Sequence, residues 1–477
     1  MSKELADDGR DETTMVVLEA FEDGEEGNPK GFSTLMKVFL MFACCLLNIG
    51  AGMSSALFGP AQQSIMDRFG VEKGVAELAG TLFLFGYSLG PLIWSPISEA
   101  AGRYWAMIPA MLLFVIFHLM TGLANNIATF LIGRFLQGLT GVCSVLLIGC
   151  VTGDIFYPKH VQICIGFNLM AIYISPVLGP IISSFLIEWG SLEWVSWALM
   201  IIGGTFSAVS LFMKETYAPV LLRRKAKRLR KEGRDVVAGI ELHPINMEVF
   251  MTKYVKRPAF MLIKDRALAF LSFYTAIVYG LLYGLLIAFP IAFGNERGFK
   301  YIPTYLPTIS ISIGIAISVV LLIGTNNRYI RRKDAVGRAD PELRLENCCI
   351  GAIFLPVGLF LFGWTASYAH VHWVVPCLGG IFMGFGTSIV YICCILYIID
   401  GYKLYAASAF AVNGVLRSLC CTLLASVTRL MIDKMTLGGA MSFFGGIAVL
   451  VAPGPFILLR YGAQWRIEKE KRLGSAW

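Results

Sequence analysis

Long apolar runs, separated by short polar turns, dominate the pattern along this chain. A helix that crosses a bilayer needs about 20 consecutive apolar residues. Runs of that length lie at 35–58, 75–97, 104–123, 127–151, 161–187, 194–213, 267–291, 303–325, 347–367, 372–398, 404–431 and 437–460. The pattern therefore predicts an all-α membrane protein with twelve transmembrane helices.

One long polar segment, 214–266, divides these runs into two sets of six. We expect a six-helix bundle over 34–213, a basic cytoplasmic loop over 214–266 and a second six-helix bundle over 267–461. An acidic tail at 1–33, without a basic region leading into an apolar core, predicts a disordered segment rather than a cleaved signal peptide. The remaining residues, 462–477, form a short C-terminal tail.

The charges are few and unevenly placed. Only 15% of the residues are charged and 56% are hydrophobic, which is typical of a polytopic membrane protein. Basic residues concentrate in the segments that share one side of the membrane if twelve crossings are correct. The positive-inside rule then places both termini in the cytoplasm. The basic run 221–234 predicts contact with anionic lipid headgroups and no nucleic-acid partner.

The sequence predicts no metal site and no cofactor. The 12 cysteines lie in apolar runs, without C-x-x-C or Cys/His spacing. A phosphate-binding G-x-x-x-x-G-K-[ST] segment is also missing from the sequence, so ATP drive through such a loop has no support.

Two arginines stand inside apolar runs, Arg134 in the fourth and Arg417 in the eleventh. A charge at membrane depth costs about 2.5–3.5 kcal/mol on insertion scales, so it normally faces the protein interior and marks function. We interpret both as buried charges that take part in transport, with a structural hydrogen bond as the alternative for Arg417.

The turn between the second and third runs is a candidate cytoplasmic gate. A carboxylate and a guanidinium at adjacent helix ends, Glu99 and Arg103, can pair and hold one conformation shut. The residues assigned to this gate are Gly90, Glu99, Gly102, Arg103 and Asp154.

The fifth run carries a stripe of small residues. Ser175, Gly179 and Ser183 recur every four residues beside Pro176 and Pro180, which predicts a face for close helix packing.

Polar and aromatic residues of several runs are candidates for a central cavity. Tyrosine combines an apolar face with a hydroxyl, and aromatic faces attract organic cations, so an amphipathic or cationic substrate would suit them. The candidates are Asn48, Gln137, Asn168, Tyr173, Tyr279, Tyr283, Tyr391, Tyr397 and Asn413. The sequence does not identify a proton carrier: the runs hold no central carboxylate, and His118 is interpreted as a packing residue.

These motifs together resemble the major facilitator superfamily, in particular its fungal twelve-span drug:proton antiporters, which include polyamine and azole exporters. GPLIWSPISEAAGRYW (90–105) is similar to the family's loop motif, IGRFLQG (132–138) to its fourth-span motif, and GDIF (153–156) to the close of that span. YIIDGY (397–402), AASAFAVNGVLRS (406–418) and PGPFILLRYG (453–462) continue the resemblance. The resemblance implies the major facilitator fold and a role for Arg134 in proton coupling.

The chain departs from the family pattern at two places. Tyr104 stands where a second basic residue is usual, and serines 175, 183 and 184 replace glycines of the fifth-span motif.

The expected function is proton-coupled efflux of a small organic molecule (a drug, toxin, polyamine or secondary metabolite) by alternating access. The expected partners are that substrate, protons and the lipid bilayer, with the chain acting as a monomer in the plasma membrane or, alternatively, the vacuolar membrane. A uniporter or proton symporter for an organic acid remains an alternative, because two buried arginines would suit an anion. A membrane-embedded enzyme or a receptor is a remoter alternative, and we do not expect an enzyme.

Overall fold

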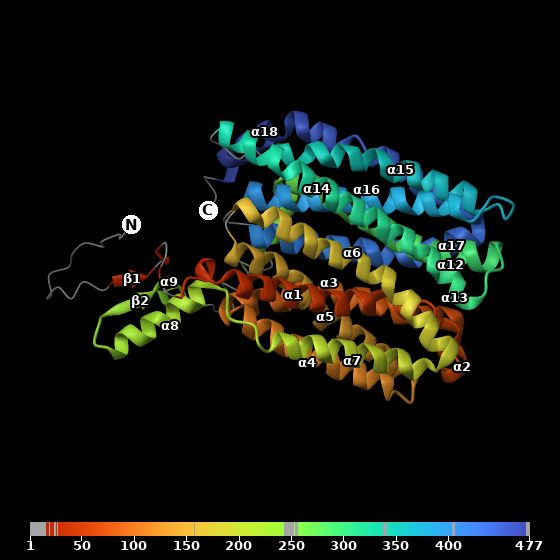
Figure 1. Cartoon of the computed structure of the whole chain (residues 1–477), viewed down its shortest axis with the longest axis horizontal. Helices are drawn as coiled ribbons and strands as arrows, with labels where there is room; N and C mark the ends of the chain where they lie inside the picture. The colour runs from red at the N-terminus through yellow and green to blue at the C-terminus, as the bar shows by residue number, and fades with distance from the viewer. Residues whose placement is uncertain are drawn as a thin grey trace.

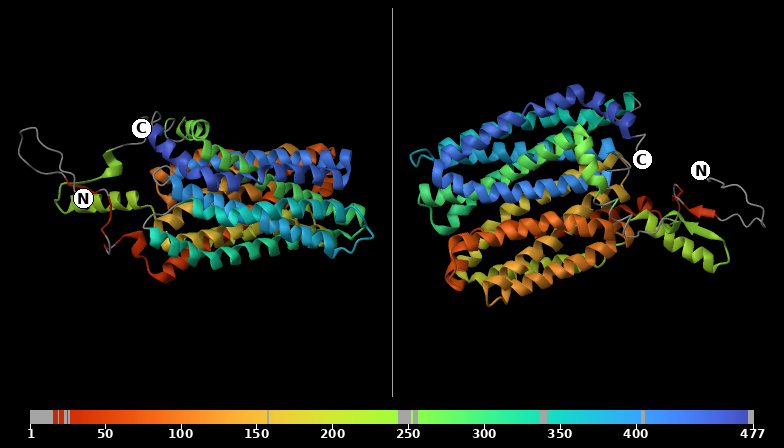
Figure 2. Two further views of the ribbon diagram at one scale, coloured as in Figure 1. Left: turned by 90° about the horizontal axis from the view of Figure 1, so that it is seen from above. Right: turned by 180° about the vertical axis from the view of Figure 1, so that it is seen from behind.

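The computed structural model describes residues 16–18, 20–22, 25, 27–156, 158–242, 252, 256–336, 341–402 and 406–473. Within them, long helices run side by side and form two bundles, one from each half of the chain (Figures 1 and 2). The fold class expected from the apolar runs is confirmed.

The first bundle begins where Ser33 caps a helix by accepting a hydrogen bond from the Met36 amide at 3.3 Å. Asn126 caps a later helix in the same way, through the Thr129 amide at 2.8 Å. The elements of this bundle are α1 (Thr34–Ala56), α2 (Gln62–Phe69), α3 (Lys73–Ala100), α4 (Arg103–Gly122), α5 (Ile127–Ile155), α6 (Pro158–Trp189) and α7 (Leu192–Ser210).

The second bundle begins at the Asp265 carboxylate, which accepts hydrogen bonds from the amides of Ala267 and Leu268. Its long helices are α12 (Arg266–Pro290), α14 (Ile309–Val336), α15 (Leu345–Ala366), α16 (Val374–Tyr402), α17 (Ala406–Val451) and α18 (Gly454–Leu473). Shorter turns connect them: η3 (Ile291–Glu296), α13 (Tyr301–Tyr305), η4 (Leu306–Thr308) and η5 (Pro341–Arg344).

In the described residues, eleven helical stretches are long and apolar enough to cross a membrane, and the last of them runs over 58 residues, Ser408–Trp465. A single helix of that length would extend about 87 Å, nearly three times the thickness of the bilayer core. The backbone leaves the helical region at Thr436, with φ 68° and ψ 163°, and divides the stretch in two. The structure therefore holds twelve crossings, as the sequence predicts.

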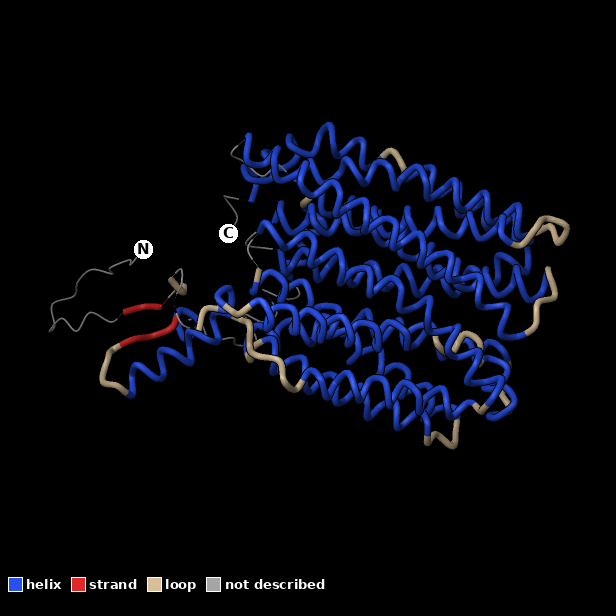
Figure 3. Tube along the Cα trace, viewed as in Figure 1, coloured by secondary structure: helices blue, strands red, loops and turns tan. Residues whose placement is uncertain are grey.

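The polar segments contain more structure than the sequence suggests. In the acidic tail, β1 (Val16–Leu18) pairs in parallel with β2 (Val236–Ala238), and η1 (Pro29–Gly31) follows (Figure 3). The basic segment forms α8 (Ala218–Lys231), β2, α9 (Gly239–Leu242) and α11 (Arg257–Lys264). Apolar side chains of α8, β1 and β2 share a small core at Leu18, Phe21, Leu222, Ala226, Val236 and Ala238. The tail expected to be disordered is thus ordered over 16–18, while residues 1–15 lie outside the described part.

The C-terminal segment also differs from expectation. Residues 462–473, expected as a tail, continue α18. The eighth span likewise continues as helix to Val336, into the basic connection that follows it.

Two helix pairs make the most extensive contacts between the bundles. α3 packs against α17, and α6 packs against α14, so the second and fifth spans of each half contact the fifth and second spans of the other. This exchange is typical of two halves related by an axis along the membrane normal.

Polar contacts between the halves gather at the end that carries α2 and α13, opposite to α8 and the strands (Figure 1). Tyr301 donates to the Pro60 carbonyl at 2.7 Å, and Arg429 donates to Gln62 Oε1 at 3.1 Å. Thr81 Oγ1 and Ser426 Oγ lie 3.4 Å apart. These contacts hold the halves together at that end.

Candidate functional site

Arg134 lies in α5 and is completely buried within the first bundle. Its Nε donates to the Ala79 carbonyl at 2.9 Å, its Nη2 to the Ser54 carbonyl at 2.9 Å, and its Nη1 to Ser54 Oγ at 3.2 Å and to Gln137 Oε1 at 2.6 Å. The rings of Phe58 and Phe83 lie 4.5 and 4.7 Å from the guanidinium carbon. This charge is held between α1, α3 and α5 by neutral acceptors and two aromatic faces.

A buried polar network continues from this arginine to α4. Gln137 donates to the Phe117 carbonyl at 3.0 Å and to Thr121 Oγ1 at 2.8 Å. His118 Nε2 lies 3.3 Å from Ser54 Oγ, the same hydroxyl that accepts from Arg134. The arginine, the hydroxyl and the imidazole therefore form one connected group inside the first bundle.

Arg417 lies in α17 at the junction of the two halves and is 2% exposed. Its Nη1 donates to the Tyr391 hydroxyl, and its guanidinium carbon lies 4.6 Å from the Tyr279 ring centre and 5.0 Å from that of Tyr391. Tyr173, from the other half, packs against both rings at centroid distances of 5.3 Å. A tyrosine cluster drawn from α6, α12 and α16 thus surrounds the second buried charge.

A small cavity lies beside this cluster, between the halves. Its volume is about 10 Å³, enough for a single water molecule. The Tyr283 hydroxyl and Ser55 Oγ, 2.8 Å apart, link the halves at its wall. The lining residues are Gly52, Ser55, Leu84, Tyr87, Val145, Ile172, Tyr279, Tyr283, Ser418 and Cys421. Among the described residues, the cavity between the halves is therefore small and lined largely by aromatic and apolar side chains.

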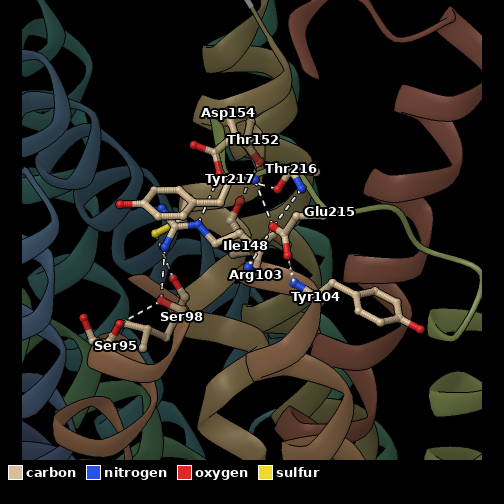
Figure 4. Close-up of polar contacts among 12 residues, drawn as sticks. Ser95, Ser98, Arg103, Tyr104, Ile148, Thr152, Asp154, Glu215, Thr216 and Tyr217 are labelled. Atoms are coloured by element: carbon tan, nitrogen blue, oxygen red, sulfur yellow. Dashed lines mark hydrogen bonds and ion pairs between the residues drawn. The ribbon is translucent and has the colours of Figure 1, made fainter. Parts of the chain in front are cut away.

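A cluster of charges joins the ends of α3, α4, α5 and α7 near α8 (Figure 4). Arg103 Nε donates to Asp154 Oδ2 at 3.2 Å, and Arg103 Nη1 donates to Ser98 Oγ at 3.1 Å. The guanidinium carbon lies 4.2 Å from the Tyr217 ring centre. Burial raises the pKa of the Tyr217 hydroxyl to about 12, so this ring stays neutral at physiological pH. Arg103 is thus paired with Asp154, which also belongs to the predicted gate.

Glu215 completes the cluster by capping α4 from a distance. Its carboxylate accepts hydrogen bonds from the amides of Arg103 at 2.9 Å and Tyr104 at 3.3 Å, at a helix start that has no side-chain cap of its own. The amides of Thr216 and Tyr217 donate to the same carboxylate at 2.9 Å. A carboxylate at a helix N-terminus is favoured by the helix dipole. The chain that follows α7 is thereby tied to the start of α4.

Gly102 is required at this junction. Its φ of 109° with ψ of 165° lies in a region that glycine alone adopts readily, and a Cβ there would overlap the Glu215 carboxylate. A side chain at this position would strain the backbone and displace the cap.

We expect Gly102→Ala to lower the initial rate of transport at least about tenfold, because about 1–3 kcal/mol of backbone strain adds to the loss of the Glu215 cap. The measurement is transport by purified protein in vesicles at matched protein content, together with the melting temperature. Gly74→Ala is the control: Gly74 is exposed, with nothing within 4 Å of the added Cβ. Equal rates and melting temperatures for Gly102→Ala and wild type would contradict the assignment.

The small-residue face of α6 packs against α1. A Cβ on Gly52 of α1 would overlap Ser175 Oγ, and a Cβ on Gly179 would lie 2.6 Å from the Met53 carbonyl. Pro176 and Pro180 lie inside the helix, and Ser183 is completely buried. The predicted close approach of the fifth span is therefore present, with α1 as its partner.

The remaining predicted residues fall into two groups. Asn48, Asn168 and Asn413 are buried within the bundles: Asn168 donates to the Cys164 carbonyl at 2.8 Å, and Asn413 donates to Thr275 Oγ1 at 2.7 Å. Gly90 and Tyr397 lie away from their predicted sites. A Cβ on Gly90 would overlap Val142 of α5, so Gly90 belongs to helix packing, and the Tyr397 hydroxyl lies near Gly462, at the end of α16 that carries the Arg344–Asp400 ion pair.

Several residues of these sites escaped the sequence analysis. Glu215 and Tyr217 belong to the segment KETYAPV (214–220), at the start of the basic loop, where the sequence alone gives no sign of contact with α4. Tyr87 and Ser55 line the cavity but stand in apolar runs without a distinguishing pattern. The pair Arg344–Asp400, at 2.9 Å, repeats in the second half the arrangement of Arg103 and Asp154.

The comparisons with known proteins agree with this geometry. The sequence model of the Major Facilitator Superfamily matches residues 44–425. The chain is 32% identical to the ascochitine biosynthesis cluster MFS transporter of Didymella fabae, over 95% of this chain and 88% of that protein. It is 32% identical to the major facilitator superfamily multidrug transporter FLU1 of Candida albicans (92% and 73% covered) and 34% identical to the MFS-type efflux pump MFS2 of Trichophyton rubrum (92% and 74%).

Among solved structures, the proton:xylose symporter XylE bound to 6-bromo-6-deoxy-D-glucose superposes with a TM-score of 0.68 at 15% identity, covering 90% of this chain and 96% of that one. At this identity the likeness shows the fold. The two helical bundles and the family match together define a secondary membrane transporter, and not an enzyme. The chain belongs to the Major Facilitator Superfamily.

Proposed function

We propose that this transporter exports a small organic molecule in exchange for protons that enter the cell. The observation that carries the proposal is the aromatic cavity between the halves, beside the buried charge of Arg417. Alternating access requires a site of this kind, placed between two bundles. Relatives that are named a multidrug transporter and an efflux pump support the outward direction.

The coupling to protons rests on the buried network of the first bundle. Arg134 and His118 share Ser54 Oγ, and both side chains are fully buried. In the described spans, the Asp and Glu residues lie within about two turns of a span end, so this network supplies a guanidinium and an imidazole deep in a bundle that has no described carboxylate at that depth. We assign Arg134 to coupling, in keeping with the family motif that it resembles.

The orientation follows from charge. The basic helix α8, the strands and the end of α18 lie at one end of the bundles (Figure 1). The positive-inside rule supports a cytoplasmic location for that end, and with it for both termini. We place the protein in the plasma membrane and expect it to act as a monomer, because one chain supplies both walls of the cavity.

The direct test uses inside-out membrane vesicles with an acidic interior. We expect rhodamine or naphthoate to accumulate inside while protons leave, reported by a pH-sensitive dye, and we expect a protonophore to abolish accumulation. Vesicles without the protein are the control. Accumulation that survives collapse of the pH gradient would instead favour a uniporter. Arg417 has no acidic partner among the described residues, and this favours a second candidate function, a uniporter with an organic acid as its substrate.

A further inference from the structure

We propose that Arg417 and the tyrosines around it form an anion-binding subsite, which selects substrates that carry a carboxylate or phenolate on an aromatic ring. The transport of such substrates rests on the proposed function, whereas their binding does not. The inference starts from a contrast between the two buried arginines.

The N–H donors of Arg134 find acceptors within its bundle, whereas those of Arg417 are only partly used. The Arg134 guanidinium donates four hydrogen bonds and lies between two phenylalanine rings. Arg417 donates one, to Tyr391, and its buried Nε has no acceptor among the described residues. A buried polar group without a partner is costly, and a bound water, ion or ligand is one explanation for it. Of the two buried arginines, Arg417 is therefore the one with unfilled donor capacity, and it lies at the junction of the halves.

Within the described ranges, no carboxylate lies beside Arg417. The residues that line the adjacent cavity include none. The Asp and Glu residues of the described spans stand within about two turns of the span ends. A guanidinium at membrane depth without a counter-ion is expensive, and a planar carboxylate matches its fork of N–H donors. An anionic group on the substrate would supply the missing charge.

The same geometry disfavours organic cations. The sequence suggested that tyrosine faces would attract them, but Arg417 already lies over the rings of Tyr279 and Tyr391. A second cation at those rings would meet a like charge in a closed space.

The ring of an aromatic substrate has its own partners. Tyr279 contacts Arg417 and also lines the cavity, together with Tyr283 and Tyr87. Aromatic pairs prefer offset or edge-to-face contact, which the existing rings already show. The Tyr173 hydroxyl is buried in the same cluster without a partner among the described residues, so it can donate to a second oxygen of the ligand. The guanidinium that would bind the carboxylate and the tyrosines that would contact the ring therefore lie next to each other.

The test measures binding of tritiated naphthoate to the purified full-length protein in detergent, with neutral naphthamide and cationic naphthylmethylamine as competitors. The variants are Arg417→Gln and Arg417→Lys. Arg460→Gln is the matched control, because Arg460 also lies beside a tyrosine, Tyr461, but on the exposed surface of α18. Each measurement is repeated in gluconate and in chloride buffer at one ionic strength.

We expect naphthoate to bind at least about tenfold more tightly than naphthamide, and the amine to compete least. Arg417→Gln should erase that preference, while Arg460→Gln keeps it. Arg417→Lys should keep the order of the ligands with about tenfold weaker naphthoate binding, and it serves if the glutamine variant does not fold. Three results would overturn the subsite: a preference that survives Arg417→Gln, undiminished naphthoate binding in Arg417→Lys, or displacement of naphthoate by chloride, which would mark an inorganic anion site.

The two proposals fail separately. If binding is selective for the charge but a pH gradient drives no transport, the subsite is supported and the proposed efflux is contradicted. If a pH gradient drives rhodamine accumulation but naphthoate is not preferred in binding, the efflux is supported and the subsite is contradicted.

Discussion

Arg134→Met should abolish accumulation driven by a pH gradient, by at least about a hundredfold, while the protein still reaches the membrane. The methionine keeps an apolar stem of similar length, so packing between Phe58 and Phe83 is largely preserved. What disappears is the charge and its four hydrogen bonds to α1, α3 and α5. Hydrogen bonds to a charged group are worth about 1.5–3 kcal/mol each. Losing all four removes the links from Arg134 to α1, α3 and α5, and we expect coupling to fail for that reason.

Arg134→Lys is the matched variant for this prediction. A lysine keeps the charge but offers three donors without the planar fork, so it cannot reproduce all four contacts. We expect about tenfold slower transport, with some dependence on pH retained. The measurement is uptake into vesicles at equal protein content, compared with exchange of labelled for unlabelled substrate at zero pH gradient. Wild-type uptake by Arg134→Met would remove this residue from the coupling mechanism.

The apolar runs and the long basic segment were sufficient to predict twelve spans in two bundles. The fold follows from the sequence because the bilayer imposes a length and a hydropathy on each helix. Even the division inside the 58-residue stretch was predictable, since the run is interrupted by Asp433 and Lys434 before Thr436. Arg134 and Arg417 were recognisable for the same reason, because a charge within a span has no inexpensive place except the interior.

Contacts between distant segments were not predictable in this way. Glu215 caps a helix that starts 112 residues earlier, and its own neighbours give no sign of that partner. The sequence offers Glu99 and Asp154 as acidic partners for Arg103. The ion pair with Asp154 depends on the packing of α5 against α3 and α4, which the sequence does not reveal. The pairing of β1 with β2 joins segments 220 residues apart (Val16 with Val236), which local pattern cannot reveal.

The sequence also did not reveal how deep along its helix each predicted cavity residue lies. Tyr391 and Tyr397 are six residues apart on α16, which separates them by about 9 Å along the axis. The first meets Arg417 at the junction of the halves, and the second lies at the end of the helix near Gly462. Both satisfied the same criterion in the sequence, an aromatic residue with a hydroxyl, and only one belongs to the cluster around the cavity.

We propose that the two bundles move against each other around the aromatic cavity between them. Thr81 of α3 and Ser426 of α17 provide the means to test it, because their hydroxyl oxygens lie 3.4 Å apart across the junction, at the end closed by Tyr301 and Arg429. Cysteines at these two positions are close enough to form a disulfide after small side-chain adjustment. A bond there would prevent that end from opening.

The deciding measurement is therefore transport by Thr81→Cys/Ser426→Cys before oxidation, after oxidation and after reduction, with each single variant as a control. The account predicts transport that falls to background when the disulfide forms and returns when it is reduced, while both single variants stay active throughout. Transport at the wild-type rate by the fully cross-linked protein would contradict it, because substrate would then be crossing without separation of the halves at that end.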